Sequence, residues 1–281
     1  MHKQLILVLA VLGLSANLAS AQASTSRGDC SRHLEKARTY EMFGDARAVP
    51  EFQEAIKTDA SRCSIALFEL SESLSRSLRF SEAQKALHDY IVSTPKLDHK
   101  EDIKDLTKLQ NAADLKQRVD SSEEPSLVDL MELTKICDGF GRNKPKDALA
   151  YAERAVSLYP NSADALLLNA ELLLPGSLDN TRAFLLLNQA AAIDTANPRI
   201  FSLRGWCYLF KLDDRQRSEA DFREALRLSD DTEPLALKGL GYLFMFKGQR
   251  AESLAAFKKY LLTTKDDPEA LAAIKRLESS Q

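Results

Sequence analysis

Apolar residues recur through most of this chain at the three- and four-residue spacing of helices that bury one face. Between Pro234 and Lys265 they define two such helices, separated by a turn at Gly248. The first buried face consists of Leu237, Leu240, Gly241 and Phe244, and the second of Ser253, Phe257 and Tyr260. Small residues on both faces allow a close approach, and the aromatic rings fill the remaining space. The pattern therefore predicts a packed helix pair.

The same pattern repeats at a nearly constant distance along the chain. It is marked by Pro125, Pro160, Pro198, Pro234 and Pro268, which are 35, 38, 36 and 34 residues apart. Phe201, Arg204, Gly205 and Tyr208 stand at the same distances from Pro198 as the first buried face does from Pro234. A period of this size indicates stacked helix pairs rather than one large core. No alternating runs of Val, Ile and Thr predict strands.

The repeat is regular after residue 125 and blurred before residue 95. The segment 96–124 between these parts is highly charged and carries a narrow apolar stripe of Ile103, Leu106, Leu109, Ala113 and Val119. The stripe predicts a helix over about 100–120 that joins two sub-arrays. A flexible linker is the alternative, because the stripe is weak.

Four segments are therefore predicted. They are a leader at 1–21, degenerate repeats at 22–95, the connecting segment at 96–124, and a regular array at 125–281. The last segment is predicted to end in a capping helix over 269–278, whose inner face would carry Leu271, Ile274 and Leu277.

The N-terminal residues have the features of a secretory signal peptide. Lys3 supplies positive charge, Leu5 to Leu14 is a nearly unbroken apolar run, and Ala19-Ser20-Ala21 is a small-residue cleavage site. Cleavage after Ala21 would place the mature chain in the periplasm or outside the cell, with no stable membrane insertion. A retained membrane anchor is the alternative, but the run is short for a bilayer core of about 30 Å.

The chain has four cysteines, Cys30, Cys63, Cys137 and Cys207, and no Cys-x-x-Cys motif. Cys30 and Cys63 are 33 residues apart, close to one repeat, so they should occupy similar positions on successive first helices. Neighbouring helices lie about 8–10 Å apart, slightly more than the Cα limit of about 7 Å for a disulfide. A small offset in register would close this gap, so a disulfide and two free thiols both remain open. Cys137 and Cys207 lie in apolar stretches and are predicted to be buried small side chains.

The sequence offers no chemistry typical of an enzyme. His33, His88 and His99 are scattered, and the motifs of metal sites, phosphate loops and nucleophilic serines do not occur. The paired carboxylates at 213–214 and 230–231 fall in turns, where helix capping explains them better than acid–base catalysis. The chain is predicted to have no catalytic residues, metal or cofactor. With a net charge of −3 and no basic block, nucleic acid is a poor candidate partner.

The repeat unit resembles the tetratricopeptide repeat. Ala148-x3-Ala152-x2-Ala155-x2-Leu158-x-Pro160 is similar to the second helix of that family and the proline that follows it. Gly241-x2-Phe244-x3-Gly248, with Phe257, is similar to the family's first helix, turn and packing aromatic. The resemblance covers residues 126–270 most strongly and implies an all-α fold, an α-α solenoid of about six helix-turn-helix units.

The resemblance also implies where a partner would bind. In tetratricopeptide arrays the first helix of each unit lines a concave groove, and the residue after the small packing residue points into it. Here those positions are Glu171, Trp206 and Tyr242, and the neighbouring groove positions include Arg199, Lys238 and Phe246. An aromatic patch beside cations would suit a peptide or helix with apolar anchors. The alternative is that Trp206 simply packs between adjacent helices. The Lys and Asn set with which some family members clamp a carboxylate is incomplete here.

These features together predict a non-enzymatic protein-interaction or assembly scaffold of the bacterial envelope. Two alternatives remain: a structural accessory of an outer-membrane assembly, secretion or pilus machinery, and a helper or sensor module for an envelope enzyme.

Overall fold

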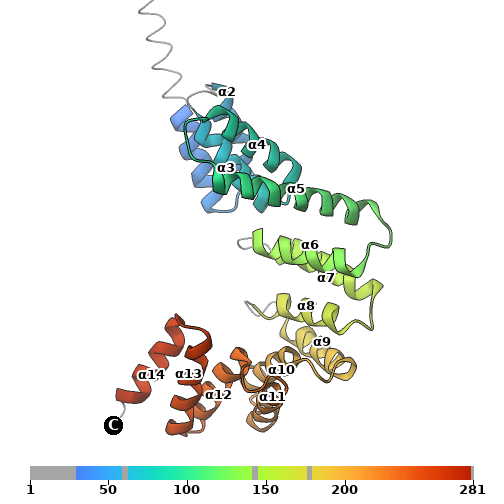
Figure 1. The fold of residues 1–281 in the computed structure, drawn as a ribbon, viewed down its shortest axis with the longest axis vertical. Helices are drawn as coiled ribbons and strands as arrows, with labels where there is room; N and C mark the ends of the chain where they lie inside the picture. The colour runs from blue at the N-terminus through green and yellow to red at the C-terminus, as the bar shows by residue number, and fades with distance from the viewer. Residues whose placement is uncertain (1–29, 59–62, 141–144, 176–178, 280–281) are drawn as a thin grey trace, which may run out of the picture. The chain divides into compact units, whose positions relative to one another are not determined.

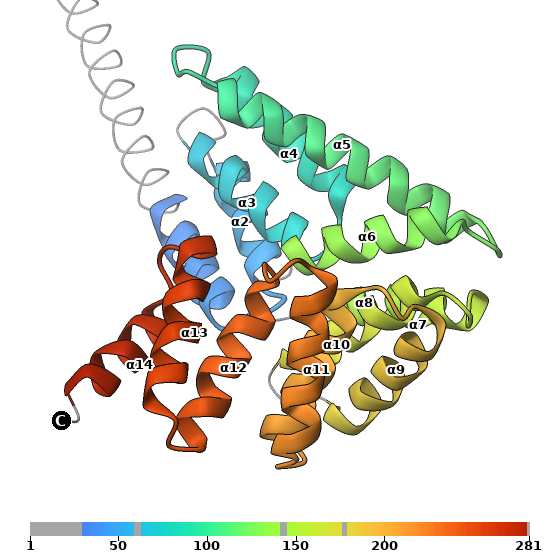
Figure 2. The same cartoon turned by 60° about the horizontal axis from the view of Figure 1, so that its bottom comes forward.

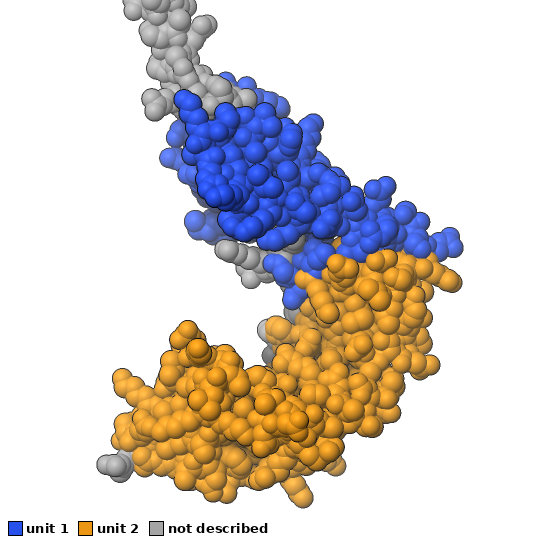
Figure 3. Space-filling view, in the orientation of Figure 1, with its two compact units in different colours: residues 1–123, 136–144 blue, residues 124–135, 145–281 orange. Residues whose placement is uncertain are grey.

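The computed structural model describes residues 30–58, 63–140, 145–175 and 179–279. Regular secondary structure within these ranges is helical, with no strand (Figure 1). The predicted signal peptide lies outside the described residues. Two compact units form, one of residues 1–123 with 136–144 and the other of residues 124–135 with 145–281 (Figure 3). No helix in the described part of the chain is both long and apolar enough to cross a membrane.

The N-terminal unit is a succession of antiparallel helix pairs. A helix over residues 30–42 is followed by α2 (Ala48–Thr58), α3 (Ser64–Arg76), α4 (Phe80–Ser93) and α5 (Lys100–Ser121). Helix α2 packs against α3, α3 against α4, and α4 against α5. The first pair turns at Gly44, whose φ of 64° lies in the left-handed region that glycine adopts without steric cost.

Helix α5 is the charged connecting segment. It has 22 residues and buries only Leu109, Ala112, Leu115 and Val119, mainly against α4. Ile103, the first residue of the predicted stripe, is exposed. The apolar stripe therefore supports packing only along the later turns of the helix, which explains why it looked weak in the sequence.

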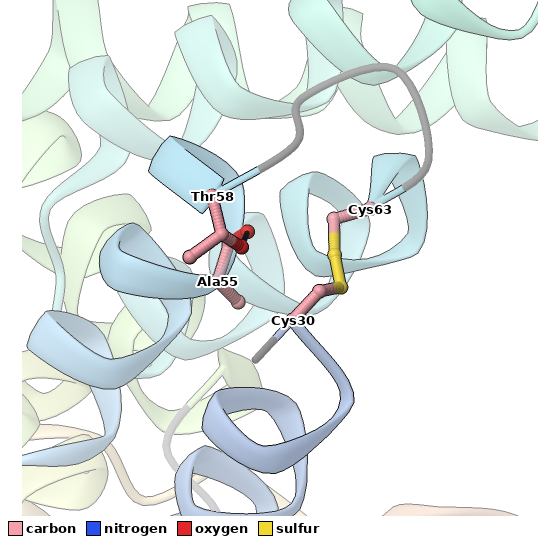
Figure 4. Close-up of a disulfide and its surroundings, with 4 residues drawn as sticks. All are labelled: Cys30, Ala55, Thr58 and Cys63. Carbon is pink, nitrogen blue, oxygen red and sulfur yellow. Dashed lines mark hydrogen bonds between the residues drawn. A yellow bond between two sulfur atoms is a disulfide. The ribbon is translucent and has the colours of Figure 1, made fainter. Parts of the chain in front are cut away.

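The structure joins Cys30 to Cys63 in a disulfide within this unit (Figure 4). The bond links the first residue of the helix over 30–42 to the N-cap of α3. The two Cα atoms are 6.5 Å apart, within the usual range for a disulfide. The two cysteines meet at the beginnings of successive first helices. Cys137 and Cys207 are both buried, as predicted from their apolar surroundings.

The C-terminal unit contains the regular repeats. Its helices are α6 (Leu127–Phe140, of which residues up to 135 belong to this unit), α7 (Pro145–Leu158), α8 (Ala163–Leu173), α9 (Asn180–Ile193), α10 (Pro198–Phe210), α11 (Arg215–Leu228), α12 (Pro234–Phe246), α13 (Arg250–Thr263) and α14 (Pro268–Ser279). Figure 2 shows α11, α12 and α13 side by side. The last three prolines of the repeat are the first residues of α10, α12 and α14. Proline suits this position because its missing N–H would have no partner within the helix.

Two glycine-phenylalanine joints hold the last two pairs together. The Phe222 ring of α11 lies against Gly205 of α10, where a Cβ would come within 2.7 Å of it. The Phe257 ring of α13 lies at the same distance from a Cβ built at Gly241 of α12. Each joint also has a buried serine on the second helix, whose Oγ donates a hydrogen bond to the glycine carbonyl oxygen at 2.9 Å (Ser218) or 2.7 Å (Ser253).

The capping helix α14 packs through Ile274 and Leu277 as predicted, but not through Leu271. Ala270 is its buried residue, and Ala273, Ile274 and Leu277 pack against the preceding pair. Leu271, predicted to face inward, is exposed. Residues 270, 273, 274 and 277 follow the helical period, whereas 271 lies about 100° away from 270 around the axis.

Candidate functional site

Four aromatic side chains form a closed ring of contacts on α10 and α12. We call Trp206, Phe210, Tyr242 and Phe246 the aromatic quartet. Along the helices, Trp206 stacks on Phe210 with centroids 4.8 Å apart, and Tyr242 stacks on Phe246 at 6.5 Å. Across the helices, Trp206 meets Tyr242 at 5.9 Å and Phe210 meets Phe246 at 5.9 Å, both edge-on. Such edge-to-face contacts are favourable arrangements for aromatic rings.

The repeat itself places these rings together. Within each helix the two aromatic residues are four positions apart, so they share one face. Trp206 and Tyr242 are 36 residues apart, as are Phe210 and Phe246, so the two pairs lie at the same height on directly neighbouring helices. The quartet is therefore the product of two aromatic positions repeated in two successive units.

The inner half of the quartet is part of the packing between helices. The Trp206 indole N–H donates to the Leu235 carbonyl oxygen at 3.0 Å, and its ring meets Phe222 edge-on at 6.4 Å. Tyr242 meets Phe257 edge-on at 5.1 Å. Trp206 therefore packs between adjacent helices, which was the alternative to its pointing into a groove. It also borders the outer half of the quartet.

The outer half of the quartet faces solvent. Phe210 and Phe246 each keep 44% of their surface exposed. A polar residue at such a helix end would not disturb the core, so packing does not require phenylalanine at either position. Tyr242 is half-buried, and no hydrogen bond to its hydroxyl occurs among the described residues. Burial raises the pKa of Tyr242 above its usual range. Its hydroxyl, protonated at neutral pH like that of any tyrosine, can donate to a bound group.

The cations predicted to flank the aromatic patch are already paired. Arg199, two turns before Trp206 on α10, contacts Glu171 of α8 at 2.8 Å and Glu233 at the start of α12 at 3.7 Å. Arg199 and Glu171 are therefore brought together as an ion pair across neighbouring first helices. This group of three carries two acids and one base.

Lys238, one turn before Tyr242, is the second paired cation. Its side chain is only 16% exposed and contacts Asp267 at 2.8 Å and Glu269 at 2.9 Å, both at the start of α14. Burial alone would lower the pKa of Lys238, but the hydrogen bonds to Asp267 and Glu269 hold it above its usual range. The same lysine holds the pKa of Asp267 well below its usual range. This group also carries two acids and one base.

Of the six residues predicted to bind a partner, the structure assembles Trp206, Tyr242 and Phe246 into one patch. Glu171, Arg199 and Lys238 instead belong to two ion-pair groups that link successive first helices, and each group has one more acid than base. The sequence prediction missed Phe210, which has the same spacing from Trp206 as Phe246 has from Tyr242. Within the described ranges, no cluster of His, Cys, Asp and Glu is arranged to hold a metal ion.

Solved structures with a similar arrangement of helices are tetratricopeptide proteins. TTC0263, a thermophilic TPR protein of Thermus thermophilus, is 17% identical over 76% of this chain and 98% of its own, with a TM-score of 0.45. A tetratricopeptide repeat protein from Parabacteroides merdae is 17% identical over 76% and 72%, with a TM-score of 0.46. PilW, a widely conserved type IV pilus biogenesis factor, is 13% identical over 87% and 98%, with a TM-score of 0.44.

The sequence matches no family model and no curated protein. Similarities at this level concern the arrangement of helices and carry no argument about partner or pathway. By its paired helices, its period of about 35 residues and its glycine-phenylalanine joints, the chain has the fold of a tetratricopeptide-repeat protein.

Proposed function

We propose that this chain is a non-enzymatic protein-interaction scaffold whose aromatic quartet binds the apolar anchors of a peptide or helix. The observation that carries the proposal is the pair of exposed phenylalanines, Phe210 and Phe246, held at 5.9 Å by two packed helices. Exposed aromatic side chains on a rigid framework lose little conformational entropy on binding, which makes them effective contact residues.

The charges around the quartet specify the partner further. Both neighbouring ion-pair groups have one more acid than base, as the contacts of Arg199 and Lys238 show. A partner whose apolar anchors are flanked by Lys or Arg would complement this excess, and its cations could also lie over the aromatic faces. An acidic C-terminal carboxylate is disfavoured, because Lys238 is already occupied by two carboxylates.

We place this scaffold outside the cytoplasm of a bacterial cell. Two features support the setting: the signal-peptide pattern at 1–21 and the Cys30–Cys63 pair, which would persist in an oxidising compartment. The measurement that tests it is the N-terminal sequence of the protein purified from its host. A mature chain beginning at Gln22 in the periplasmic or secreted fraction is expected, and an intact Met1 in the cytoplasmic fraction would contradict the setting.

Site-specific photocrosslinking in the native host tests the binding site. A photoreactive phenylalanine analogue at position 246 should give one defined adduct, whereas the analogue at exposed Leu262 of α13 should not. Adding Tyr242→Ala should reduce the adduct at 246 at least fivefold, while the thermal unfolding curve shows that the protein is still folded. The same adducts at 246 and 262, or none at 246, would contradict the proposal. An adduct with a component of an assembly, secretion or pilus machine would specify which scaffold this is.

A further inference from the structure

The N-terminal unit contains an open groove of about 1170 Å³, far from the quartet in sequence. Its walls come from the helix over residues 30–42, the turn that follows it, the first turns of α2, and α3. The residues that matter below are Met42, Phe43, Ile65, Glu69 and Glu72. We call this feature the N-terminal groove.

Large apolar side chains stand exposed at the rim of the N-terminal groove. Met42 and Phe43 are 80% and 78% exposed, and Ile65 on the opposite wall is 42% exposed. A single exposed apolar residue needs no explanation, but several gathered around one groove are typical of an interaction surface.

The fold does not require Phe43 to be apolar. The turn at Gly44 has a counterpart at Gly248, and in both the residue after the glycine donates its N–H to a carbonyl five residues earlier, at 2.9 Å. Leu78 has the same position in a third turn that closes in the same way. The residues before these three turn positions are Phe43, Lys247 and Ser77. Two of three equivalent turns thus have a polar residue where this groove has an exposed phenylalanine.

The groove also holds one uncompensated charge. Three of its acids are neutralised by arginines, in the pairs Arg38–Glu69 (2.6 Å), Arg76–Glu41 (2.5 Å) and Arg47–Asp45 (2.5 Å). Glu72 lines the groove from α3 and is exposed. It has no hydrogen bond or ion pair among the described residues. The remaining lining cation, Arg79, is held by Glu82 at 2.6 Å.

We infer that the N-terminal groove is a docking site for a protein segment that presents a large apolar side chain next to a lysine or arginine. The apolar side chain would cover Met42 and Phe43, and the cation would pair with Glu72. Charge complementarity selects this occupant, since every arginine of the groove is already satisfied and only a carboxylate is free. The site is separate from the aromatic quartet, and it can exist whether or not the quartet binds a partner.

Selection from a random peptide library on the full chain, with its disulfide intact, tests the inference. The Met42→Ser/Phe43→Ser variant serves for counter-selection, and both positions are exposed enough to change without loss of the fold, which thermal unfolding would verify. Peptides enriched on the wild-type chain alone should contain a large apolar residue close to Lys or Arg. Enrichment that is equal on the variant, or dominated by acidic peptides, would overturn the inference.

A charge swap then tests the role of Glu72. The best peptide, measured by fluorescence anisotropy, should bind the Glu72→Lys variant at least 10-fold more weakly than the wild-type chain. Replacing the basic residue of the peptide by Glu should restore binding to that variant. Glu252→Lys, an exposed change of equal charge on α13, should alter binding less than twofold. Equal weakening by both variants would overturn the inference.

Two other occupants would also overturn it. A second copy of the chain would appear as a dimer in analytical ultracentrifugation that is lost in Met42→Ser/Phe43→Ser. A lipid surface would appear as cosedimentation of the wild-type chain, but not of that variant, with vesicles of phosphatidylglycerol and phosphatidylcholine.

Discussion

The pair α3–α4 of the N-terminal unit and the last two pairs of the C-terminal unit solve one packing problem in different ways. In the C-terminal unit, Gly205 and Gly241 admit a phenylalanine ring directly onto the helix backbone. The turn at Leu78 in the N-terminal unit closes in the same way as the turn at Gly248 in the C-terminal unit. Equivalent residues of the two units can therefore be found by counting from these turns. Counted from them, Ser71 stands in the place of Gly241 and Leu87 in the place of Phe257. A larger residue on the first helix is thus matched by a smaller one on the second.

Both units have ion pairs between successive first helices, but the N-terminal unit adds a disulfide. The Cys30–Cys63 disulfide and the ion pairs of Arg38 and Arg76 all join the helix over 30–42 to α3. The comparison shows that one repeat fold can use glycine-phenylalanine packing in some helix pairs and a covalent cross-link between others. It also predicts that the two units fail under different perturbations.

Loss of the disulfide should have the largest effect, and only in the N-terminal unit. A bond that closes a loop of 33 residues stabilises by about 3–4 kcal/mol through the unfolded chain. Cys30→Ser/Cys63→Ser should lower the free energy of unfolding of this unit by that amount, measured in urea. Hydrogen exchange should rise in the helix over 30–42 and stay unchanged in α10 to α13. Unchanged exchange in the first helix would show that packing alone holds it.

Gly239→Ala should have the next largest effect, in the C-terminal unit. A Cβ at Gly239 would lie 2.3 Å from the Phe222 ring, which is fully buried and has no room to move. Overpacking of this kind costs about 1–3 kcal/mol, more than the better helix propensity of alanine returns. Urea unfolding of the variant measures the loss.

Gly139→Ala is the matched control for that change. Gly139 is an exposed helical glycine with no atom within 4 Å of a built Cβ, so the variant should be more stable by about 0.5–1 kcal/mol. A loss of stability in both variants would mean that the phenylalanine contact is not the cause at Gly239.

Asn169→Leu should stabilise the C-terminal unit slightly. Asn169 is fully buried, and neither polar atom of its side chain has a hydrogen-bond partner among the described residues. The equivalent position in the other first helices, seven residues after the N-cap, is Arg204 in α10 and Leu240 in α12. Arg204 is hydrogen-bonded to Asp221 at 2.7 Å, and leucine needs no hydrogen bond. Leucine has a shape similar to asparagine but no polar group to leave unpaired. The replacement should therefore raise the free energy of unfolding by about 1 kcal/mol. A decrease would mean that the amide is hydrogen-bonded in solution.

The smallest expected effect is a pH dependence at the start of α5. His99 is hydrogen-bonded through Nδ1 to Asp102 at 2.7 Å and through Nε2 to the Thr94 carbonyl oxygen at 2.7 Å, and Tyr90 covers its ring edge-on. The bond to Asp102, then that to Thr94, and the nearby charge of Asp98 raise the pKa of His99 above its ordinary 6.5.

The sign of this dependence follows from the raised pKa. The protonated imidazole stabilises the fold fully below pH 6.5, and the stabilisation is lost as the pH rises through the raised value. The stability difference between the wild-type chain and His99→Gln should therefore be largest near pH 5.5 and shrink toward pH 8.5, in urea unfolding at each pH. Asp102→Asn should weaken that trend, and a difference that grows with pH would refute it.

The buried face of each helix in the regular part could be predicted residue by residue. Leu237, Leu240 and Gly241 are buried on α12 as expected, because the helical period and the proline at its start leave only one packing phase. The phase of α14 was not predictable in the same way. With packing on one side only, the sequence allowed Leu271 or Ala270 inward, and the neighbouring helix α13 determined which.

The candidate site was predictable only in its aromatic part. Trp206, Tyr242 and Phe246 could be placed on one surface from the 36-residue repeat. The pairing of Lys238 with Asp267 and Glu269 could not be predicted in this way. These side chains are 29 and 31 residues away in the sequence, at the start of α14. The exposed pair Met42 and Phe43 gave no signal either, since apolar residues at a helix end are expected to be buried.

By itself the sequence determined the helices, their pairing and the small-residue joints, because helical periodicity and steric size act between near neighbours in the chain. Only the tertiary structure decided which charges are free and which apolar residues are exposed. Those properties depend on contacts between separate repeats, where a single ion pair or a difference of about 100° in helix phase changes what remains available to a partner.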